Sequence, residues 1–136
     1  MAHGKMSGQI FISYRRDESR WSARSLYDRL AARFDRTHIF IDIDAIALGE
    51  DFLKAIENKV GECDVLIAII GPLWMTSTDG QGGRRLDNPE DFVRMEIATA
   101  LSRNIRVIPV LMDGALMPQS TDLPDDLKPL FVEMRC

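Results

Sequence analysis

Cysteine is scarce in this chain, and long apolar runs are absent. The two cysteines, Cys63 and Cys136, are too few for a disulfide framework or a cysteine-based metal site. We therefore expect a reducing compartment, of which the cytoplasm is the simplest. No apolar run reaches the roughly 18 residues that a membrane-spanning helix requires, and residues 1–6 lack the apolar stretch of a signal peptide. These absences argue against a membrane partner and against covalent cross-links.

Positive charge is also in deficit. The 136 residues include 17 Lys and Arg against 21 Asp and Glu, which gives a formal net charge of −4. No general basic field is therefore present to neutralise phosphates, and we expect no direct nucleic-acid partner. With 46% hydrophobic and 28% charged residues, the composition is typical of one globular domain. We interpret residues 1–8 as a tag or a disordered N-terminus and residues 9–136 as the domain.

Four apolar runs predict the strands of a sheet. They are Gln9–Tyr14, His38–Asp42, Asp64–Ile70 and Ile105–Met112. Helical spacing follows the first three runs, starting after Ser19 and after Asp51, and then from Asn88 or Pro89. A short helical turn is expected within residues 123–131. Strands that alternate with helices predict a doubly wound α/β fold with a parallel sheet.

Glu96 lies at the edge of an apolar face in the third predicted helix. Val93 and Ile97 belong to the apolar stripe of this helix, and Glu96 lies on its flank together with Phe92. Two interpretations are open at this point. Glu96 is either a surface residue beside the stripe or a partly desolvated carboxylate that faces a cleft and works there.

Several segments are expected to meet at one edge of the sheet, because ligands of such folds bind beyond the carboxyl ends of the strands. These segments are residues 14–17, 42–49, 71–85 and the start of the helix that carries Glu96. Arg15 and Arg16 follow the first strand, where paired guanidinium groups can clamp an anion. The alternative is a solvated loop charge or an ion pair with Asp17 or Glu18.

Several common catalytic motifs are missing. Residues 80–85 break the dinucleotide-binding glycine fingerprint at its third glycine, and no P-loop ending is present. A phosphoacceptor receiver domain is excluded because Gly71, and not an aspartate, follows the third strand. His3 and His38 have no partners at metal-ligand spacing, so we expect no bound metal and no Ser-His-Asp triad.

Five motifs follow one another along nearly the whole chain. They are Phe11–Arg16, Phe40–Asp42 with the loop that contains Gly49, Cys63–Leu66 with Gly71–Trp74, Val93–Ile97 with Ala100 and Leu101, and Val107–Leu111. Together, from about Gln9 to Phe131, they resemble a Toll/interleukin-1 receptor (TIR) domain of bacterial type. The resemblance implies a flavodoxin-like sheet in the order 2-1-3-4-5. We expect its fifth strand and last helix to be truncated here, as part of a longer protein.

The resemblance implies cleavage of the bond between nicotinamide and ribose in NAD+, with NAD+ as substrate and no separate cofactor. By position, Glu96 matches the catalytic glutamate of the family. The expected substrate-binding residues are Tyr14, Arg15, Arg16, Asp42, Trp74 and Phe92. The loop that matches the BB loop of the family, which gates the pocket and mediates self-association, consists of Ala45, Ile46, Ala47, Leu48 and Gly49.

Phe92 departs from the family pattern, because many active members carry Trp at this position. The leading hypothesis is an NAD+ hydrolase or cyclase that is switched on when copies of the TIR domain form a homo-oligomer, in antiphage defence or host interference. A non-enzymatic TIR adaptor that acts through TIR-TIR contacts stays open as the alternative. So does a nucleotide sensor without turnover, and the sequence does not decide between a linear and a cyclic product.

Overall fold

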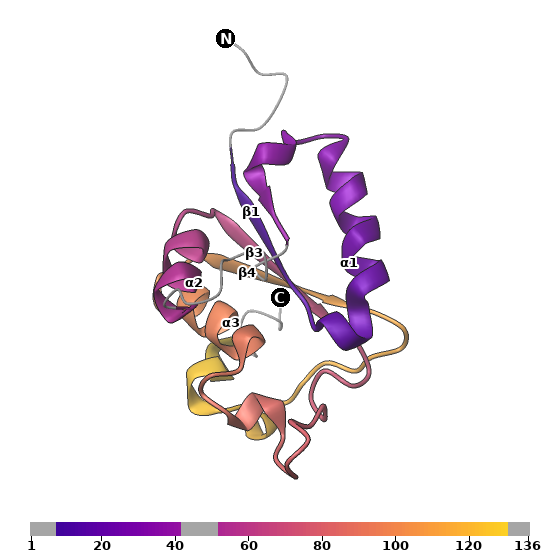
Figure 1. The fold of residues 1–136 in the computed structure, drawn as a ribbon, viewed down its shortest axis with the longest axis vertical. Helices are drawn as coiled ribbons and strands as arrows, with labels where there is room; N and C mark the ends of the chain where they lie inside the picture. Colours follow the sequence, from indigo (N-terminus) through magenta and orange to yellow (C-terminus); the bar gives the residue numbers. More distant parts are fainter. Residues whose placement is uncertain (1–7, 42–51, 131–136) are drawn as a thin grey trace.

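The computed structural model describes residues 8–41 and 52–130 (Figure 1). The strands are β1 (Ile10–Ser13), β2 (Ile39–Phe40), β3 (Val65–Ile70) and β4 (Arg106–Leu111). The α-helices are α1 (Arg16–Ala31), α2 (Phe52–Gly61) and α3 (Phe92–Ser102). Short 3-10 turns lie at residues 36–38, 85–87, 120–122 and 125–127. The last of these turns confirms the short helical turn predicted within residues 123–131.

The strands form one parallel sheet in the order β2-β1-β3-β4. Figure 1 shows α1 on one side of this sheet and α2 with α3 on the other. This arrangement confirms the predicted doubly wound α/β fold and its strand order 2-1-3-4. The described residues contain no fifth strand.

Strand β3 lies between β1 and β4 and is apolar along its whole length. Leu66 and Ala68 belong to the core cluster that includes residues of α2 and α3. Ile67 and Ile69 belong to the second cluster, with residues of α1 on the opposite face of the sheet. An unbroken apolar run is what a parallel strand covered on both faces requires. Pro109 lies in β4, which is the last strand of the described sheet, and an edge strand tolerates the missing N–H of proline.

Two predicted helix starts were wrong by a few residues. Helix α1 begins at Arg16, and only Tyr14 and Arg15 separate it from β1. Ser19 lies inside this helix with non-helical φ and ψ of −119° and 21°. Helix α3 is capped by Asp91, whose carboxylate accepts a hydrogen bond from the Arg94 N–H at 3.2 Å. Asn88 instead accepts a bond from the Glu90 N–H at 2.9 Å and closes the turn before the helix. The start of α1 has no side-chain cap, so no capping residue marked it in the sequence. At α3, Asn88 and Asp91 are both capping residue types, so the sequence alone did not decide between them.

Cys63 behaves as a small buried hydrophobe. Its side chain is in the core cluster of α2 and α3, and burial raises the pKa of its thiol to about 12. The thiol therefore stays protonated near neutral pH, which excludes it as a nucleophile. In the part of the chain that the structure describes, no helix is long and apolar enough to cross a membrane.

Truncation of a core side chain in α3 should strongly destabilise the fold. Ile97 is 0% exposed, so Ile97→Ala removes buried methyl groups and leaves a cavity, and we expect a loss of about 2–5 kcal/mol in the free energy of unfolding. Ile108 of β4 is 40% exposed, so Ile108→Ala is the matched control with a smaller expected loss. Urea unfolding followed by circular dichroism measures both. Equal losses in the two variants would contradict this placement of α3.

Candidate functional site

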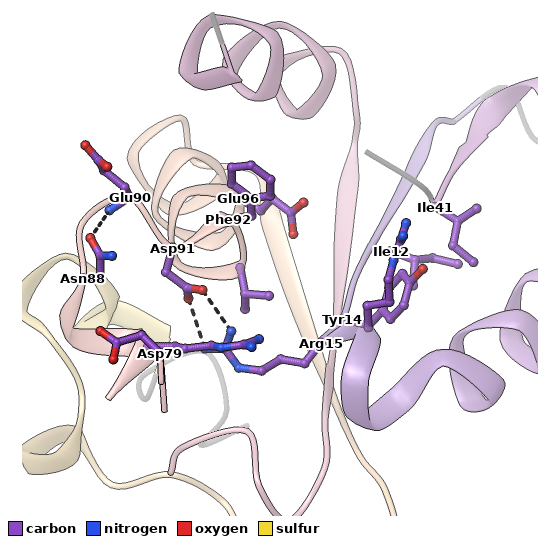
Figure 2. A pocket seen from close by; sticks show the side chains of 13 residues that line it. Ile12, Tyr14, Arg15, Ile41, Asp79, Asn88, Glu90, Asp91, Phe92 and Glu96 are labelled. Atoms are coloured by element: carbon purple, nitrogen blue, oxygen red, sulfur yellow. Dashed lines mark hydrogen bonds and ion pairs between the residues drawn. The ribbon is translucent and has the colours of Figure 1, made fainter. Parts of the chain in front are cut away.

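A cavity of about 380 Å³ lies where β1, α3 and the segment 79–91 meet. It is at the carboxyl end of β1, as predicted for a ligand site of this fold. Its lining includes five of the residues expected to act on substrate: Tyr14, Arg15, Arg16, Phe92 and Glu96. Figure 2 shows Glu96 and Phe92 on one side of the cavity and Tyr14, Ile12 and Ile41 on the other.

Glu96 is the buried carboxylate of this cavity. Its side chain projects from α3 and is only 5% exposed. Figure 2 shows its carboxylate pointing into the space between α3 and the end of β1, next to the Phe92 ring. Glu96 is therefore not a surface residue beside the stripe: its carboxylate is buried and faces a cleft, and its activity there stays a prediction. The ring and the carboxylate meet because residues four apart share one side of a helix.

Arg15 joins β1 to α3 through a buried ion pair. Its two terminal nitrogens donate to the two carboxylate oxygens of Asp91 at 2.9 and 3.0 Å, and its Nε donates to the Trp74 carbonyl at 3.3 Å. Arg15 is 3% exposed. The carboxylate partner of Arg15 is therefore Asp91, and in the described chain the ion pair with Asp17 or Glu18 that the sequence left open is not formed. Arg15 lies in the cavity wall, but its donors are directed at the protein.

The two acids that follow β1 have other partners. Asp17 accepts a hydrogen bond from Arg85 at 3.0 Å. Glu18 accepts a hydrogen bond from the Leu73 N–H. Both bonds connect the first turn of α1 to the long segment after β3, so this segment is tied to the edge of the site.

Trp74 is not part of the cavity lining. Its side chain is 1% exposed and packs in the core cluster of α2 and α3. The prediction that the Trp74 ring contacts substrate is therefore corrected: the ring is a core residue. The large ring is buried because the turn after β3 folds back, with the Trp74 N–H donating to the Gly71 carbonyl at 3.1 Å. Trp74 contributes to the site through its main-chain carbonyl, which holds Arg15.

Four further residues of the site were not predicted as site residues from the sequence. Asp79, Asn88, Glu90 and Asp91 also line the cavity. Of these, Asp91 carried a readable signal, because an aspartate directly before a helical apolar pattern is a typical N-cap. The others became recognisable only when the segment was seen folded over the strand ends.

Two parts of the predicted site lie outside the described residues. They are Asp42 and the BB-loop residues Ala45, Ile46, Ala47, Leu48 and Gly49. Their expected roles stay predictions. Within residues 8–41 and 52–130, no group of three or more His, Cys, Asp or Glu side chains could hold a metal ion.

Comparison with sequence models of protein families gives a match over almost the whole chain. The pattern of the TIR domain matches residues 10–133. This chain belongs to the TIR domain family. The predicted resemblance to a TIR domain of bacterial type is thereby confirmed.

Two curated relatives of this TIR domain carry names that refer to NAD+ or to cyclic ADP-ribose. The chain is similar to a probable 2′ cyclic ADP-D-ribose synthase of Brachypodium distachyon, at 28% identity over 93% of this chain and 54% of the relative. It is also similar to the NAD(+) hydrolase sarm1 of Drosophila melanogaster, at 26% identity over 88% of this chain and 8% of the relative. The chain thus spans about half, or much less, of the length of these relatives.

Solved structures support the fold. The TIR-STING receptor from C. gigas superposes with a TM-score of 0.58 at 22% identity, over 96% of this chain and 38% of the receptor chain. Its complex with 2′,3′-cGAMP gives a TM-score of 0.59 over 95% of this chain and 35% of that chain. At this identity the likeness concerns the fold alone.

The ion pair between Arg15 and Asp91 should be essential for stability. Asp91→Asn keeps the size and the capping oxygen of the side chain but removes its charge, which leaves a buried guanidinium without its carboxylate. We expect a loss of about 3 kcal/mol in the free energy of unfolding, measured by urea denaturation. Asp87→Asn is the control, because Asp87 makes an exposed ion pair with Arg84, and its effect should be much smaller. If both variants unfold at the same urea concentration, the ion pair does not have this role.

Proposed function

We propose that this TIR domain cleaves the bond between nicotinamide and ribose in NAD+. The observation that carries the proposal is the buried Glu96 carboxylate, which points into the cavity beside the Phe92 ring (Figure 2). The names of the two curated relatives, an NAD(+) hydrolase and a probable cyclic ADP-ribose synthase, support this substrate. NAD+ is the substrate in this proposal, and no further cofactor is needed.

Glu96 is the strongest candidate among the acids of the cavity. Four acidic residues of the described chain line it: Asp79, Glu90, Asp91 and Glu96. Asp79 and Glu90 are exposed at its rim, where water screens their charge. Asp91 is paired with Arg15. Glu96 combines burial with a position inside the cavity, where a negative charge acts more strongly on a substrate than it would in water.

One carboxylate is sufficient for this reaction. Nicotinamide leaves NAD+ as a neutral ring, so its departure needs no general acid. The ribosyl group that remains develops positive charge like an oxocarbenium ion, which a fixed anion stabilises. A carboxylate can also accept hydrogen bonds from ribose hydroxyls and so orient the sugar. Water as the attacking group gives ADP-ribose, and an adenine nitrogen gives a cyclic product.

We also propose that activity depends on self-association through the BB-loop residues 45–49. The function would serve antiphage defence or host interference in the cytoplasm. These parts of the proposal rest on the family resemblance. A TIR domain that acts only as an adaptor would associate in the same way but would release no nicotinamide from NAD+.

Glu96→Gln should abolish most of the NAD+ cleavage. The amide has nearly the same shape as the carboxylate but lacks the charge that stabilises the ribosyl transition state, so we expect a decrease in kcat of about 100-fold or more. The measurement is chromatography of nicotinamide, ADP-ribose and cyclic ADP-ribose, repeated over a wide range of protein concentration so that assembled protein is included.

Glu62→Gln is the matched control for this experiment. Glu62 is exposed after the end of α2 and does not line the cavity, so this variant should retain the wild-type rate. Equal rates in wild type and Glu96→Gln would refute the catalytic role of Glu96. Absence of nicotinamide from concentrated wild-type protein would favour the adaptor.

Phe92 should position the substrate beside Glu96. Phe92→Ala removes a ring that lines the cavity, and we expect KM for NAD+ to rise by about 5-fold or more. Phe92→Trp offers a larger ring, and should preserve or lower KM. Steady-state kinetics of nicotinamide release measure both variants. A Phe92→Ala variant with unchanged kinetics would show that the ring serves packing alone.

A further inference from the structure

A second hollow adjoins the cavity of Glu96. Its volume is about 390 Å³, and we call it the α1 hollow. It is lined by Tyr14, Arg16, Arg20, Trp21, Arg24 and Ile41. Tyr14, Arg16 and Ile41 also line the Glu96 cavity, so the two spaces share a wall. A ligand long enough to cross this wall can occupy both.

The α1 hollow carries positive charge in a chain that is negative overall. Arg20 and Arg24 are four residues apart in α1 after the irregular Ser19, which places them on one side of the helix, and Arg16 lies before Ser19 but lines the same hollow. All three are exposed, and the formal net charge of the chain is −4. This local reversal of sign favours a ligand with negative charge, because guanidinium groups bind phosphate oxygens well.

Two of these arginines have no acidic partner in the described chain. Arg20 makes no hydrogen bond or ion pair with the residues that the structure describes, and Arg24 lies over the Tyr27 ring at 5.5 Å from its centre. The acids in the first turn of α1 are bound elsewhere, with Asp17 on Arg85 and Glu18 on the main chain after β3. The common explanation for surface arginines, neutralisation by a neighbouring carboxylate, therefore does not apply to Arg20 and Arg24.

The α1 hollow also offers an aromatic surface. Trp21 lies between the arginines in sequence and is 80% exposed, whereas a ring of this size is usually mostly buried. Tyr14 lines the hollow as well. Aromatic rings beside arginines are the combination that binds a nucleotide, since the rings stack on the base and the guanidinium groups hold the phosphates.

We infer that the α1 hollow binds the adenosine diphosphate end of the dinucleotide whose nicotinamide end lies beside Glu96. This inference rests on the proposed function. NAD+ consists of two nucleosides joined by a diphosphate, and the structure has two adjoining spaces with a shared wall at Arg16. Arg20 and Arg24 hold the diphosphate, and Trp21 stacks on adenine. The arrangement makes α1 the element that recognises the part of the substrate remote from the reacting bond.

The test measures binding of ADP to the full chain by calorimetry. ADP has the diphosphate and the adenine but no nicotinamide, so its binding requires no catalysis. We expect the double variant Arg20→Gln/Arg24→Gln to bind ADP about 5-fold or more weakly, and Trp21→Ala to show a similar loss. ADP binding to the wild type should also weaken as salt rises from 50 to about 300 mM, because the arginines are exposed.

The control is Arg33→Gln/Arg36→Gln, which removes the same charge beyond the end of α1, outside the hollow. It should bind ADP as the wild type does. In NAD+ cleavage, the Arg20/Arg24 variant should raise KM and leave kcat unchanged, since these residues act far from the reacting bond. Circular dichroism confirms that each variant is folded.

The outcomes separate this inference from the proposed function. No ADP binding, or equal ADP affinity in the two double variants, overturns the inference even if NAD+ is cleaved. ADP binding that depends on Arg20, Arg24 and Trp21 supports it even if the wild type releases no nicotinamide, a result that would instead refute the proposed function.

Discussion

The site depends on the ion pair between Arg15 and Asp91. Arg15 lies two residues after Ser13, the last residue of β1, and Asp91 is the N-cap of α3, so the pair fixes the helix start to the strand end. Glu96 lies a little more than one turn further along the same helix. A shift of the helix start would therefore move the Glu96 carboxylate relative to Tyr14 and the rest of the opposite wall.

This ion pair also determines which charges face a ligand. The Arg15 guanidinium is directed at Asp91 and at the Trp74 carbonyl, which neutralises an acid that would otherwise repel phosphates inside the cavity. Arg20 and Arg24 project from α1 without acidic partners in the described chain. Glu96 thus supplies a buried carboxylate where we propose that positive charge develops, and Arg20 and Arg24 supply exposed positive charge at α1, where we propose that phosphates bind.

Most of the fold could be read from the sequence. The unbroken apolar run of β3 and the shorter runs of β1, β2 and β4 predicted a parallel sheet, because strands covered on both faces lose the usual alternation. The positions of the helix starts were less accurate. Ser19 and Asn88 are good capping residues in isolation. Helix α1 nevertheless begins at Arg16 and α3 at Phe92, after its N-cap Asp91, and contacts of both helix starts with distant segments accompany this, which local propensity does not include.

The sequence by itself determined the family, through the order of its motifs, and placed Glu96 and Phe92 as neighbours on one helix, through its periodicity. The strand order was implied by the resemblance to that family. Only the tertiary structure decided what each side chain touches. It paired Arg15 with Asp91 and buried the Trp74 ring, although both residues had been expected to contact substrate. It also brought Arg20, Trp21 and Arg24 into the α1 hollow, which adjoins the cavity of Glu96. These outcomes depend on contacts between residues as much as 76 positions apart in the chain, and no local pattern encodes such contacts.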